Sequence, residues 1–418
     1  MLGLLTQRRF APLFWTQFLS AFNDNFLKNA LIFLIMFKLP PGHAQSLITL
    51  ASGLFILPFF LLSGLGGEMA DRYDKALVAQ RLKLAELSAA ALSVAGFALQ
   101  SVPLLFIALV LFGTVSALFG PIKYGILPDH LRRHELPAGN ALVEGATFVA
   151  ILIGTLAGAL VMRQGGDPAR FAGAMIVISL LSYGASLLIP KTGEAAPKLV
   201  LDANIFRSTR HLLADLRADS KLFRAGVMVS LFWMFGIIAL SLLPPTIKLR
   251  LGGDEMAVSL FLALFAVAVA CGSGLGSYLC RDGIKLAPTP IAAFVIGLSA
   301  ADLAWALHGS APPPSFWESF LVWRVGADLA VMAAAGGVLA VPSFSAAQAW
   351  APVDKRARVV AAINVLNAAF MVTGTLAVAL VQGAGLDLAG VFALLALTCW
   401  LSALWMFRNL PENPPRGD

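Results

Sequence analysis

Long apolar runs, each about the length of a membrane-spanning helix, follow one another along most of the chain. A helix crosses the hydrocarbon core of a bilayer with about 20 predominantly apolar residues. Within each run the apolar residues are continuous and do not alternate with polar ones, which favours helices over a membrane barrel. The pattern predicts an all-α polytopic membrane protein with twelve transmembrane helices, at 10–37, 45–66, 82–100, 102–120, 141–162, 171–190, 223–247, 257–279, 288–308, 317–341, 359–381 and 387–407.

One long hydrophilic interval divides six of these runs from the other six. The sequence therefore predicts an N-terminal six-helix half, a cytoplasmic linker, a C-terminal six-helix half and a short cytoplasmic tail, at 1–190, 191–222, 223–410 and 411–418. Within the linker, residues 205–216 have the pattern of an interfacial helix. Its expected membrane anchors are Phe206, Leu212, Leu213 and Leu216.

The two halves share short sequence matches in the same register. The connection Gly67–Lys75 after the second run corresponds in place to Gly276–Lys285 after the eighth, although the second copy has its acidic residue after its arginine. The fifth and eleventh runs both contain Gly-Thr-Leu-Ala, at Gly154 and Gly374. Internal repeats of this kind are common in transporters. They predict two pseudosymmetric halves.

Composition and charge agree with a membrane protein. The chain is 59% hydrophobic and only 13% charged, about half the charged fraction of a soluble domain. With Lys83, Lys123 and Arg224 counted as loop residues, Lys and Arg concentrate in the connections on one side, which places both termini in the cytoplasm. Lys28 and Arg324 lie within the runs. The net charge of +7 is this loop bias, so no nucleic-acid partner is implied.

The first run contains SAFNDNFLKNAL, a polar stretch where a bilayer should be. At 100° per residue, Asp24, Asn25, Lys28 and Asn29 lie on one side of the helix. The opposite side, expected to face lipid, carries Trp15, Leu19, Phe22, Phe26, Ala30 and Phe33.

Asp24 and Lys28 are spaced i, i+4 and could form an ion pair along the helix. A charge at the centre of a bilayer costs at least about 2.5 kcal/mol, so such residues normally face a cavity or a partner. A purely structural ion pair explains these two residues but not the neighbouring asparagines, whose amides also need partners. The stretch therefore predicts the wall of a hydrated cavity and a substrate-binding role.

Other charges within the runs are sparse. Arg324 and Asp328 have the same i, i+4 spacing, and pseudosymmetry predicts that they also face the cavity and bind substrate. Asp302 is an alternative partner for Arg324, which would make a structural network. Glu144 lies near the cytoplasmic end of its run, where water would reach it. Aromatic residues of the seventh run are expected to contact lipid: Phe232, Trp233 and Phe235.

The sequence carries no enzyme constellation. The glycine-rich stretch Gly272–Gly276 lies within an apolar run with no preceding strand, so helix packing explains it better than phosphate binding. His130 and His134 have helical spacing but no carboxylate or cysteine nearby in sequence, so no metal site is expected. We expect a protein that is not an enzyme, needs no cofactor, and transports passively or with an ion.

The connection after the second run resembles the signature loop of the major facilitator superfamily. It reads Gly67-x-x-x-Asp71-Arg72-x-x-Lys75. The resemblance implies that this loop ties the two halves together on the cytoplasmic face and controls opening. The residue types suit that task, because glycine allows close helix contact and an aspartate can accept from a helix N-terminus.

Two further stretches, Phe22–Leu31 and Phe119–Pro128, resemble the lysophospholipid transporters of bacterial inner membranes. The resemblance implies a transporter or flippase that moves lysophospholipids such as lysophosphatidylethanolamine from the outer to the inner leaflet. An acyltransferase with acyl-carrier-protein synthetase activity, either separate or fused, would then reacylate them. The chain is expected to be a stand-alone transporter or the membrane part of such a fusion.

Such a substrate has a charged headgroup and one acyl chain. Asp24 would meet an ammonium, and Lys28 or Arg324 a phosphate. Two alternatives stay open. One is a proton-coupled exporter of amphipathic drugs, with Asp24 as the protonated carboxylate. The other is a membrane scaffold that recruits lipid-remodelling enzymes without transporting anything.

Overall fold

A computed structural model describes residues 1–38, 41–162, 167–202 and 204–410, so the predicted tail 411–418 lies outside the described residues. Within those ranges the chain forms helices and no strand. Twelve of the helices are 20 to 32 residues long: α1 (Ala11–Lys38), α2 (Pro41–Arg72), α3 (Lys75–Ala98), α4 (Val102–Gly125), α6 (Leu136–Val161), α7 (Pro168–Leu187), α9 (Ser220–Pro245), α10 (Glu255–Leu279), α11 (Pro288–Leu307), α12 (Phe320–Trp350), α13 (Arg356–Gly383) and α14 (Leu388–Arg408).

Short helices occupy several of the connections. They are η1 (Leu2–Thr6), α5 (Leu127–His130), η2 (Arg133–Glu135), α8 (Ile205–Ala218), the π-helical turn η4 (Thr246–Arg250) and η5 (Val353–Lys355). In the described part of the chain, ten helices are long and apolar enough to cross a membrane. The other two long helices, α1 and α3, carry polar and charged residues in their middle or first half. The predicted all-α architecture is confirmed.

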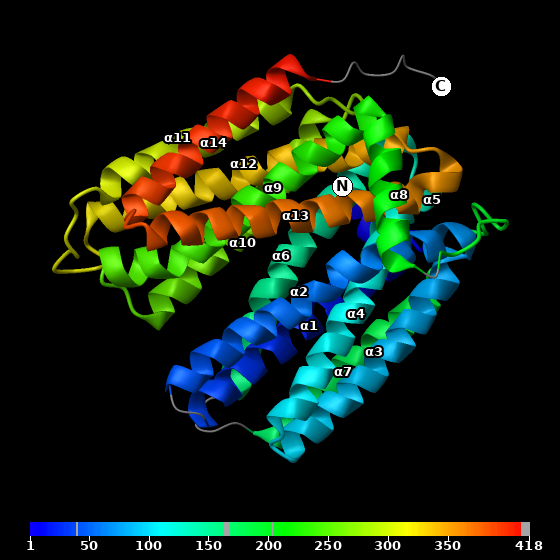
Figure 1. Cartoon of the computed structure of the whole chain (residues 1–418), viewed down its shortest axis with the longest axis horizontal. Coiled ribbons are helices and arrows are strands. Elements are labelled where there is room, and N and C mark those ends of the chain that lie inside the picture. Colours follow the sequence, from blue (N-terminus) through cyan, green and yellow to red (C-terminus); the bar gives the residue numbers. More distant parts are fainter. Residues whose placement is uncertain (39–40, 163–166, 203, 411–418) are drawn as a thin grey trace.

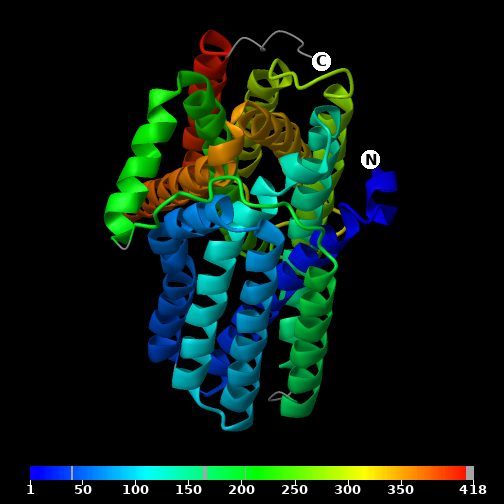
Figure 2. The same ribbon diagram turned by 90° about the vertical axis from the view of Figure 1, so that its right-hand side faces the viewer.

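The helices pack as two groups with the same internal arrangement. In the first group α1 packs on α6, α2 on α4, and α3 on α7; in the second group α9 packs on α13, α10 on α12, and α11 on α14. Figures 1 and 2 show these groups as two bundles whose helix axes are inclined to one another. The contacts between them run mainly between α2 and α13 and between α6 and α10.

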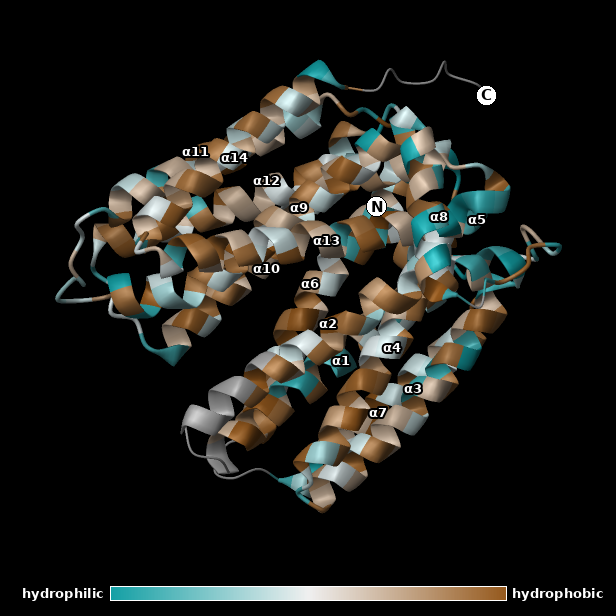
Figure 3. Ribbon diagram, viewed as in Figure 1, coloured by the Kyte–Doolittle hydropathy of each residue, from teal (hydrophilic) through white to brown (hydrophobic). Residues whose placement is uncertain are grey.

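The bundles meet at one end of the molecule, which we call the basic end. It carries the connection from α2 to α3, the short helices α5 and α8, and the connection from α12 to α13. Figure 3 shows hydrophilic residues gathered there around α5 and α8, while the long helices are mostly hydrophobic along their length. Away from the basic end the two bundles diverge (Figure 1).

Helix α3 begins earlier than the hydropathy pattern predicts. The Asp74 carboxylate caps it by accepting from the backbone N–H groups of Ala76 and Leu77, as acidic N-cap residues commonly do. The same carboxylate accepts from the N–H groups of Thr192 and Gly193 and so holds the start of the linker. The prediction of a loop up to residue 81 was therefore wrong, and the charged residues at 75–86 are helical.

The predicted linker helix is present as α8, but not all of its expected anchors face lipid. Leu212 and Leu216 are buried against the protein, whereas Phe206 is 71% exposed. Asn204 caps the helix, and Asp202 just before it binds Arg207 through two hydrogen bonds. These bonds lower the pKa of the Asp202 carboxyl to about 2, so this tie stays charged at any physiological pH.

Two surfaces that the sequence assigned to lipid are buried in part, although Trp15 of the first is 49% exposed. On α1, Phe26 stacks on Phe171 of α7 and is fully buried, because α1 packs between α6 and α7 instead of lying at the periphery. On α9, Phe232 and Phe235 are each only 3% exposed. Phe148 of α6 lies against Phe232, so these rings belong to the zone where the two bundles meet.

Candidate functional site

The polar face of α1 points into the first bundle, where protein groups supply many of its partners. The Asn25 amide donates to the carbonyl of Ala21, and the Asn29 amide donates to the carbonyl of Asn25 and to Thr155 of α6. Asn23, which lies off this face, donates to Ser179 of α7. Protein groups thus supply part of the hydrogen bonding that the sequence analysis assigned to a hydrated cavity.

Asp24 and Lys28 do not pair with each other. The Asp24 Oδ2 atom accepts from the Ser116 hydroxyl of α4 at 2.6 Å, while Oδ1 is buried without a hydrogen-bond partner. The Lys28 ammonium lies 5.7 Å from the centre of the Phe55 ring of α2, and Lys28 is only partly buried. One buried acceptor atom and one weakly partnered cation therefore occupy neighbouring turns of α1.

A second charged pair, which the sequence analysis missed, lies beside Asp24. The Lys83 ammonium of α3 contacts the Glu86 Oε2 atom at 2.5 Å and the Ser20 hydroxyl at 2.6 Å, and Ser20 also donates to Glu86. Both members of the pair are almost completely buried. The ammonium also lies 4.0 Å from the centre of the Phe119 ring. Since Ser20 is one turn from Asp24, the pair and Asp24 form one polar region.

A sequence signal for this pair existed. Lys83 and Glu86 are spaced i, i+3 on what continues as an apolar helix, a spacing that brings opposite charges together. Counting Lys83 as a loop residue concealed it. Lys123 was miscounted in the same way; it lies in α4, with its ammonium 4.8 Å from the Tyr124 ring centre.

Toward the basic end, a polar network joins the two bundles. Glu144 is buried, not hydrated as expected, and accepts from the Tyr124 hydroxyl at 2.8 Å. The Tyr124 ring stacks on Phe344 of α12 across the interface between the bundles. Asn140 of α6 and Gln348 of α12 exchange two hydrogen bonds, at 2.7 and 3.1 Å. These contacts hold α4 and α6 against α12.

The signature loop makes the tightest charged contact between the bundles. The Asp71 carboxylate accepts from the backbone N–H groups of Ala357 and Arg358 and from the Arg358 guanidinium, all at 3.0 to 3.1 Å. It therefore binds the N-terminal end of α13, where the helix dipole favours an anion. Close approach requires Gly67, because a Cβ there would lie 2.5 Å from the Ala361 Cβ atom and 2.9 Å from the Ala357 carbonyl oxygen.

The two basic residues of the loop, Lys75 and Arg72, make different contacts. The Lys75 ammonium contacts Asp129 of α5 at 2.9 Å, and Arg356 of α13 reaches the same carboxylate at 3.2 Å. Arg72 instead lies over its neighbour Tyr73 and makes no ion pair in the described part of the chain. We call Gly67, Asp71 and Lys75, together with these contacts at the basic end, the latch.

The structure does not bring Arg324 and Asp328 together with Asp24 and Lys28. Arg324 binds Asp302 of α11 through two hydrogen bonds, at 2.6 and 2.9 Å, and its guanidinium lies 4.3 Å from the Trp305 ring centre. This is the structural alternative that the sequence left open. Trp305 is 71% exposed, which places the pair on the outer side of α11 and α12.

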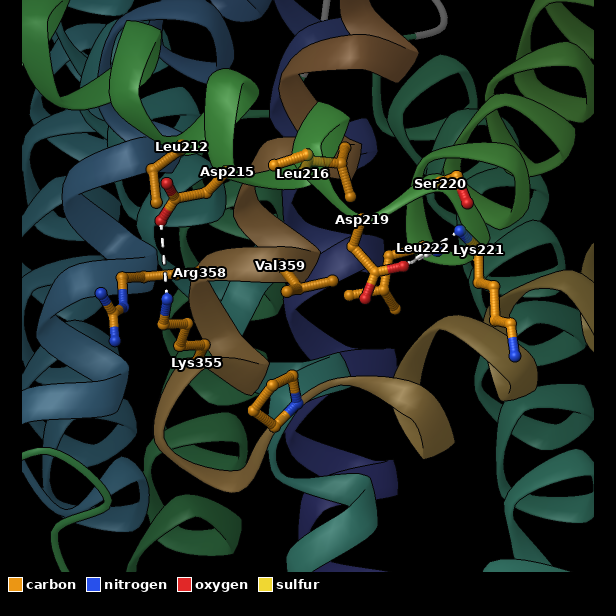
Figure 4. A pocket seen from close by; sticks show the side chains of 12 residues that line it. Leu212, Asp215, Leu216, Asp219, Ser220, Lys221, Leu222, Lys355, Arg358 and Val359 are labelled. Atoms are coloured by element: carbon orange, nitrogen blue, oxygen red, sulfur yellow. Dashed lines mark hydrogen bonds and ion pairs between the residues drawn. The ribbon is translucent and has the colours of Figure 1, made fainter. Parts of the chain in front are cut away.

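Two cavities at other places in the molecule do not coincide with these residues. One of 610 Å³ at the basic end lies between α8, the start of α9 and the connection from α12 to α13, where Asp215 faces Lys355 at 3.9 Å (Figure 4). It contains none of the predicted binding residues. A small apolar one is lined by Phe148, Phe232 and Phe235 at the bundle interface. In the described residues, no group of three or more His, Cys, Asp or Glu side chains is placed to hold a metal ion.

Comparisons with known proteins place this geometry in a family context. Residues 13–329 match the family model described as the Major Facilitator Superfamily. A lysophospholipid transporter, LplT, from Cronobacter sakazakii is 30% identical over 290 residues, which are 66% of this chain and 68% of the relative. The transporter of the same name from Pectobacterium carotovorum is 29% identical over 272 residues, covering 63% of this chain and 62% of that one.

Solved structures give the fold. The human organic anion transporter MFSD10 superposes with a TM-score of 0.77 at 16% identity, covering 96% of this chain and 98% of the other. The proton:xylose symporter XylE gives a TM-score of 0.70 at 14% identity, covering 96% of both chains. At these identities the likeness concerns the arrangement of helices alone.

Proposed function

We propose that this chain, which belongs to the major facilitator superfamily and within it to the lysophospholipid transporters, moves lysophospholipids such as lysophosphatidylethanolamine from the outer to the inner leaflet of a bacterial inner membrane. A multi-pass membrane protein of this family is a transporter, and its relatives are named for this substrate class. The direction of movement and the headgroup are our inference.

The observation that carries the proposal is the uneven polarity of the two bundles. The first bundle holds the polar region around Asp24, with its free carboxylate oxygen and the partly buried Lys28. The second bundle presents the rings of Phe232 and Phe235 toward the interface. A lysophospholipid has a zwitterionic or charged headgroup and one acyl chain, so it needs both kinds of surface.

We infer specific roles for the α1 residues. The unpartnered Asp24 oxygen is placed to accept from a headgroup ammonium, and the Lys28 ammonium to bind a phosphate. Asn25 and Asn29 fix the neighbouring backbone and side chains of α1, since each amide already donates within the protein. Arg324 is left out of this headgroup site because Asp302 already neutralises it, and Asp328 because it lies one turn from Arg324 on α12 and not on α1.

The latch supplies the conformational step. While Asp71 holds the end of α13, the basic end is closed. Transport by alternating access requires α2 and α13 to part there, which breaks the three Asp71 hydrogen bonds and the contact at Gly67. We assign the basic end to the cytoplasm because Lys and Arg gather at it; both termini are then cytoplasmic.

The product would enter the leaflet on that side, where an acyltransferase with acyl-carrier-protein synthetase activity, separate or fused, would restore the missing chain. No nucleic acid and no cofactor is part of the proposal, and the chain itself is not assigned a catalytic step.

The test is movement of lipid by the pure protein. Proteoliposomes containing labelled lysophosphatidylethanolamine in the outer leaflet are sampled over time, and albumin removes the label that has not moved. The proposal expects protein-dependent protection of the label. No protection above protein-free vesicles would overturn it and favour a scaffold. Proton-driven flux of amphipathic cations without lysophospholipid movement would instead support the drug exporter.

A further inference from the structure

A groove on the outside of the first bundle lies between α2 and the first two turns of α8. Its volume is 270 Å³. One wall is formed by the apolar residues Phe60 and Leu61 of α2, and the facing wall includes Phe206 and Leu213 of α8. Apart from Thr209 and Arg210, every side chain that lines it is apolar.

The groove is a built feature because α8 is fastened to α2. The Glu68 Oε1 atom accepts from the Ser208 hydroxyl, and Oε2 accepts from the Asp202 backbone N–H at 3.0 Å. One turn earlier on α2, Gly64 lets the helices approach closely, since a Cβ there would lie 3.2 Å from Leu212. These contacts fix the distance between the two walls.

The surroundings of the groove identify its occupant as a lipid. Phe60 and Leu61 belong to the membrane-crossing part of α2, residues 50–72. Apolar side chains at that depth are covered by acyl chains wherever protein does not cover them. Phe206 is 71% exposed beside them, and aromatic residues of interfacial helices insert at the boundary between headgroups and chains.

The positive charge of Arg210 at the groove indicates a lipid with an anionic headgroup. Arg210 is exposed and makes no ion pair in the described part of the chain, whereas Arg207, about one turn earlier on α8, is paired with Asp202. Arginine binds phosphate through parallel hydrogen bonds. No carboxylate is among the described residues that line the groove, so the groove offers no charged partner to the ammonium of a zwitterionic headgroup.

We propose that this groove binds one anionic phospholipid from the leaflet at the basic end, with its phosphate on Arg210 and one acyl chain along Phe60, Leu61 and Phe206. The bound lipid bridges α2 and α8 next to the latch at Gly67 and Asp71. This site is separate from the proposed transport site, and it does not depend on the proposed substrate.

The experiment uses the full chain, purified and titrated with phosphatidylglycerol or phosphatidylcholine, with bound lipids counted by native mass spectrometry. The test variant is Arg210→Gln. The matched control is Arg217→Gln, an exposed arginine two turns along the same helix that does not line the groove. Melting temperatures of all three proteins confirm that they are folded.

For the first bound lipid, the wild type is expected to prefer phosphatidylglycerol, and Arg210→Gln to lower that affinity about tenfold, the effect of losing a hydrogen bond to a charged group. Arg217→Gln should change it less than about twofold, as expected for a surface charge outside the site. Equal losses in the two variants would reveal a diffuse charge effect and overturn the site. So would unchanged binding by Arg210→Gln, or equal wild-type affinity for phosphatidylcholine or lysophosphatidylethanolamine.

A second variant tests the apolar wall without touching charge. Phe206→Ser should weaken the binding of phosphatidylglycerol while leaving Arg210 in place. The same substitution at Leu188, exposed on the first bundle away from α8, is the control for exposed apolar surface. Equal affinity in Phe206→Ser and wild type would exclude an acyl chain along this wall.

Discussion

At the scale of single residues, the charges within the membrane separate into two classes. Lys83 and Glu86 form an ion pair and are almost completely buried, although the Glu86 Oε1 atom has no hydrogen-bond partner in the described part of the chain. Arg324 and Asp302 also pair with each other, at the outer side of the second bundle. Asp24 and Lys28 are different, because neither has an oppositely charged contact. Charges without such partners are candidates for contact with a substrate; Asp328 and Lys123 also make no ion pair in the described part of the chain.

Arg324 and Asp302 give a prediction that separates structure from function. The double variant Arg324→Gln, Asp302→Asn should lose less than about 1 kcal/mol of stability, because partly exposed ion pairs contribute little. It should keep at least about half of the lysophospholipid flux, in line with a surface change away from the site. Thermal melting and proteoliposome uptake measure the two effects. A loss of transport at unchanged stability would instead support a substrate-binding role for Arg324.

Lys83 and Glu86 should behave as a buried pair. Lys83→Met leaves the Glu86 carboxylate buried without its cation, and such losses cost about 3–5 kcal/mol. Adding Glu86→Leu should recover most of that stability, since removing both charges of a buried pair is often neutral. Melting of the single and double variants checks this. If the double variant melts no higher than the single one, the pair has a role other than neutralising itself.

The polar residues of α1 could be predicted from sequence because they interrupt an apolar run. Their partners could not. Whether Asp24 binds Lys28 or Ser116 depends on how close α4 lies, which is a property of the packed bundle. Likewise, i, i+4 spacing made Asp328 the expected partner of Arg324, yet the better geometry belongs to Asp302 on another helix.

At the scale of elements, hydropathy predicted the existence and order of the long helices but missed several boundaries, among them the end of α12, which runs to Trp350 instead of 341, and the start of α3. Helix α3 starts at Lys75, although its first turns are charged, because the Asp74 cap and burial against the first bundle stabilise it there. Tertiary contacts therefore determine where α3 starts more strongly than the local hydropathy does. For α8, the pattern predicted a helix but could not say that Glu68 and Leu212 would dock it on α2.

Two glycines of α2 offer a matched test of the latch. At Gly67 a methyl group would collide with α13, whereas at Gly53 it would meet nothing within 4 Å. Gly67→Ala should therefore force α2 and α13 apart at the basic end and reduce flux severalfold. Gly53→Ala should leave flux unchanged, apart from the gain in stability of up to about 1 kcal/mol that alanine gives a helix. Uptake assays on both variants test this. Equal flux in the two variants would show that the close contact at Gly67 is not needed for closure of the basic end.

At the scale of the whole molecule, the two bundles are closed against each other at the basic end. The Asp71 contacts, the shared Asp129 carboxylate and the exchange between Asn140 and Gln348 all cross that interface. Each must open if substrate is to leave on that side. In the proposed transport cycle, this structure is the state in which the basic end is shut.

Loosening the latch should shift the whole molecule. Asp71→Asn weakens three hydrogen bonds to α13 by removing the charge of the acceptor. Spin labels at two exposed positions of the basic end, Leu77 and Val353, should then move apart in a background without Cys271, Cys280 and Cys399. Double electron–electron resonance measures the distance. An unchanged distance distribution would mean that Asp71 does not control closure.

The measurement that tests the central claim most directly is lysophosphatidylethanolamine uptake by the double variant Asp24→Asn, Lys28→Gln, with melting temperature recorded on the same preparations. Since the two side chains make no ion pair with each other, we predict that the variant melts within a few degrees of the wild type, as a change below about 1 kcal/mol would allow. Its uptake should fall at least about tenfold, which corresponds to the loss of one charged contact to the headgroup. Full uptake by a stable double variant would contradict the assignment of the headgroup site to α1.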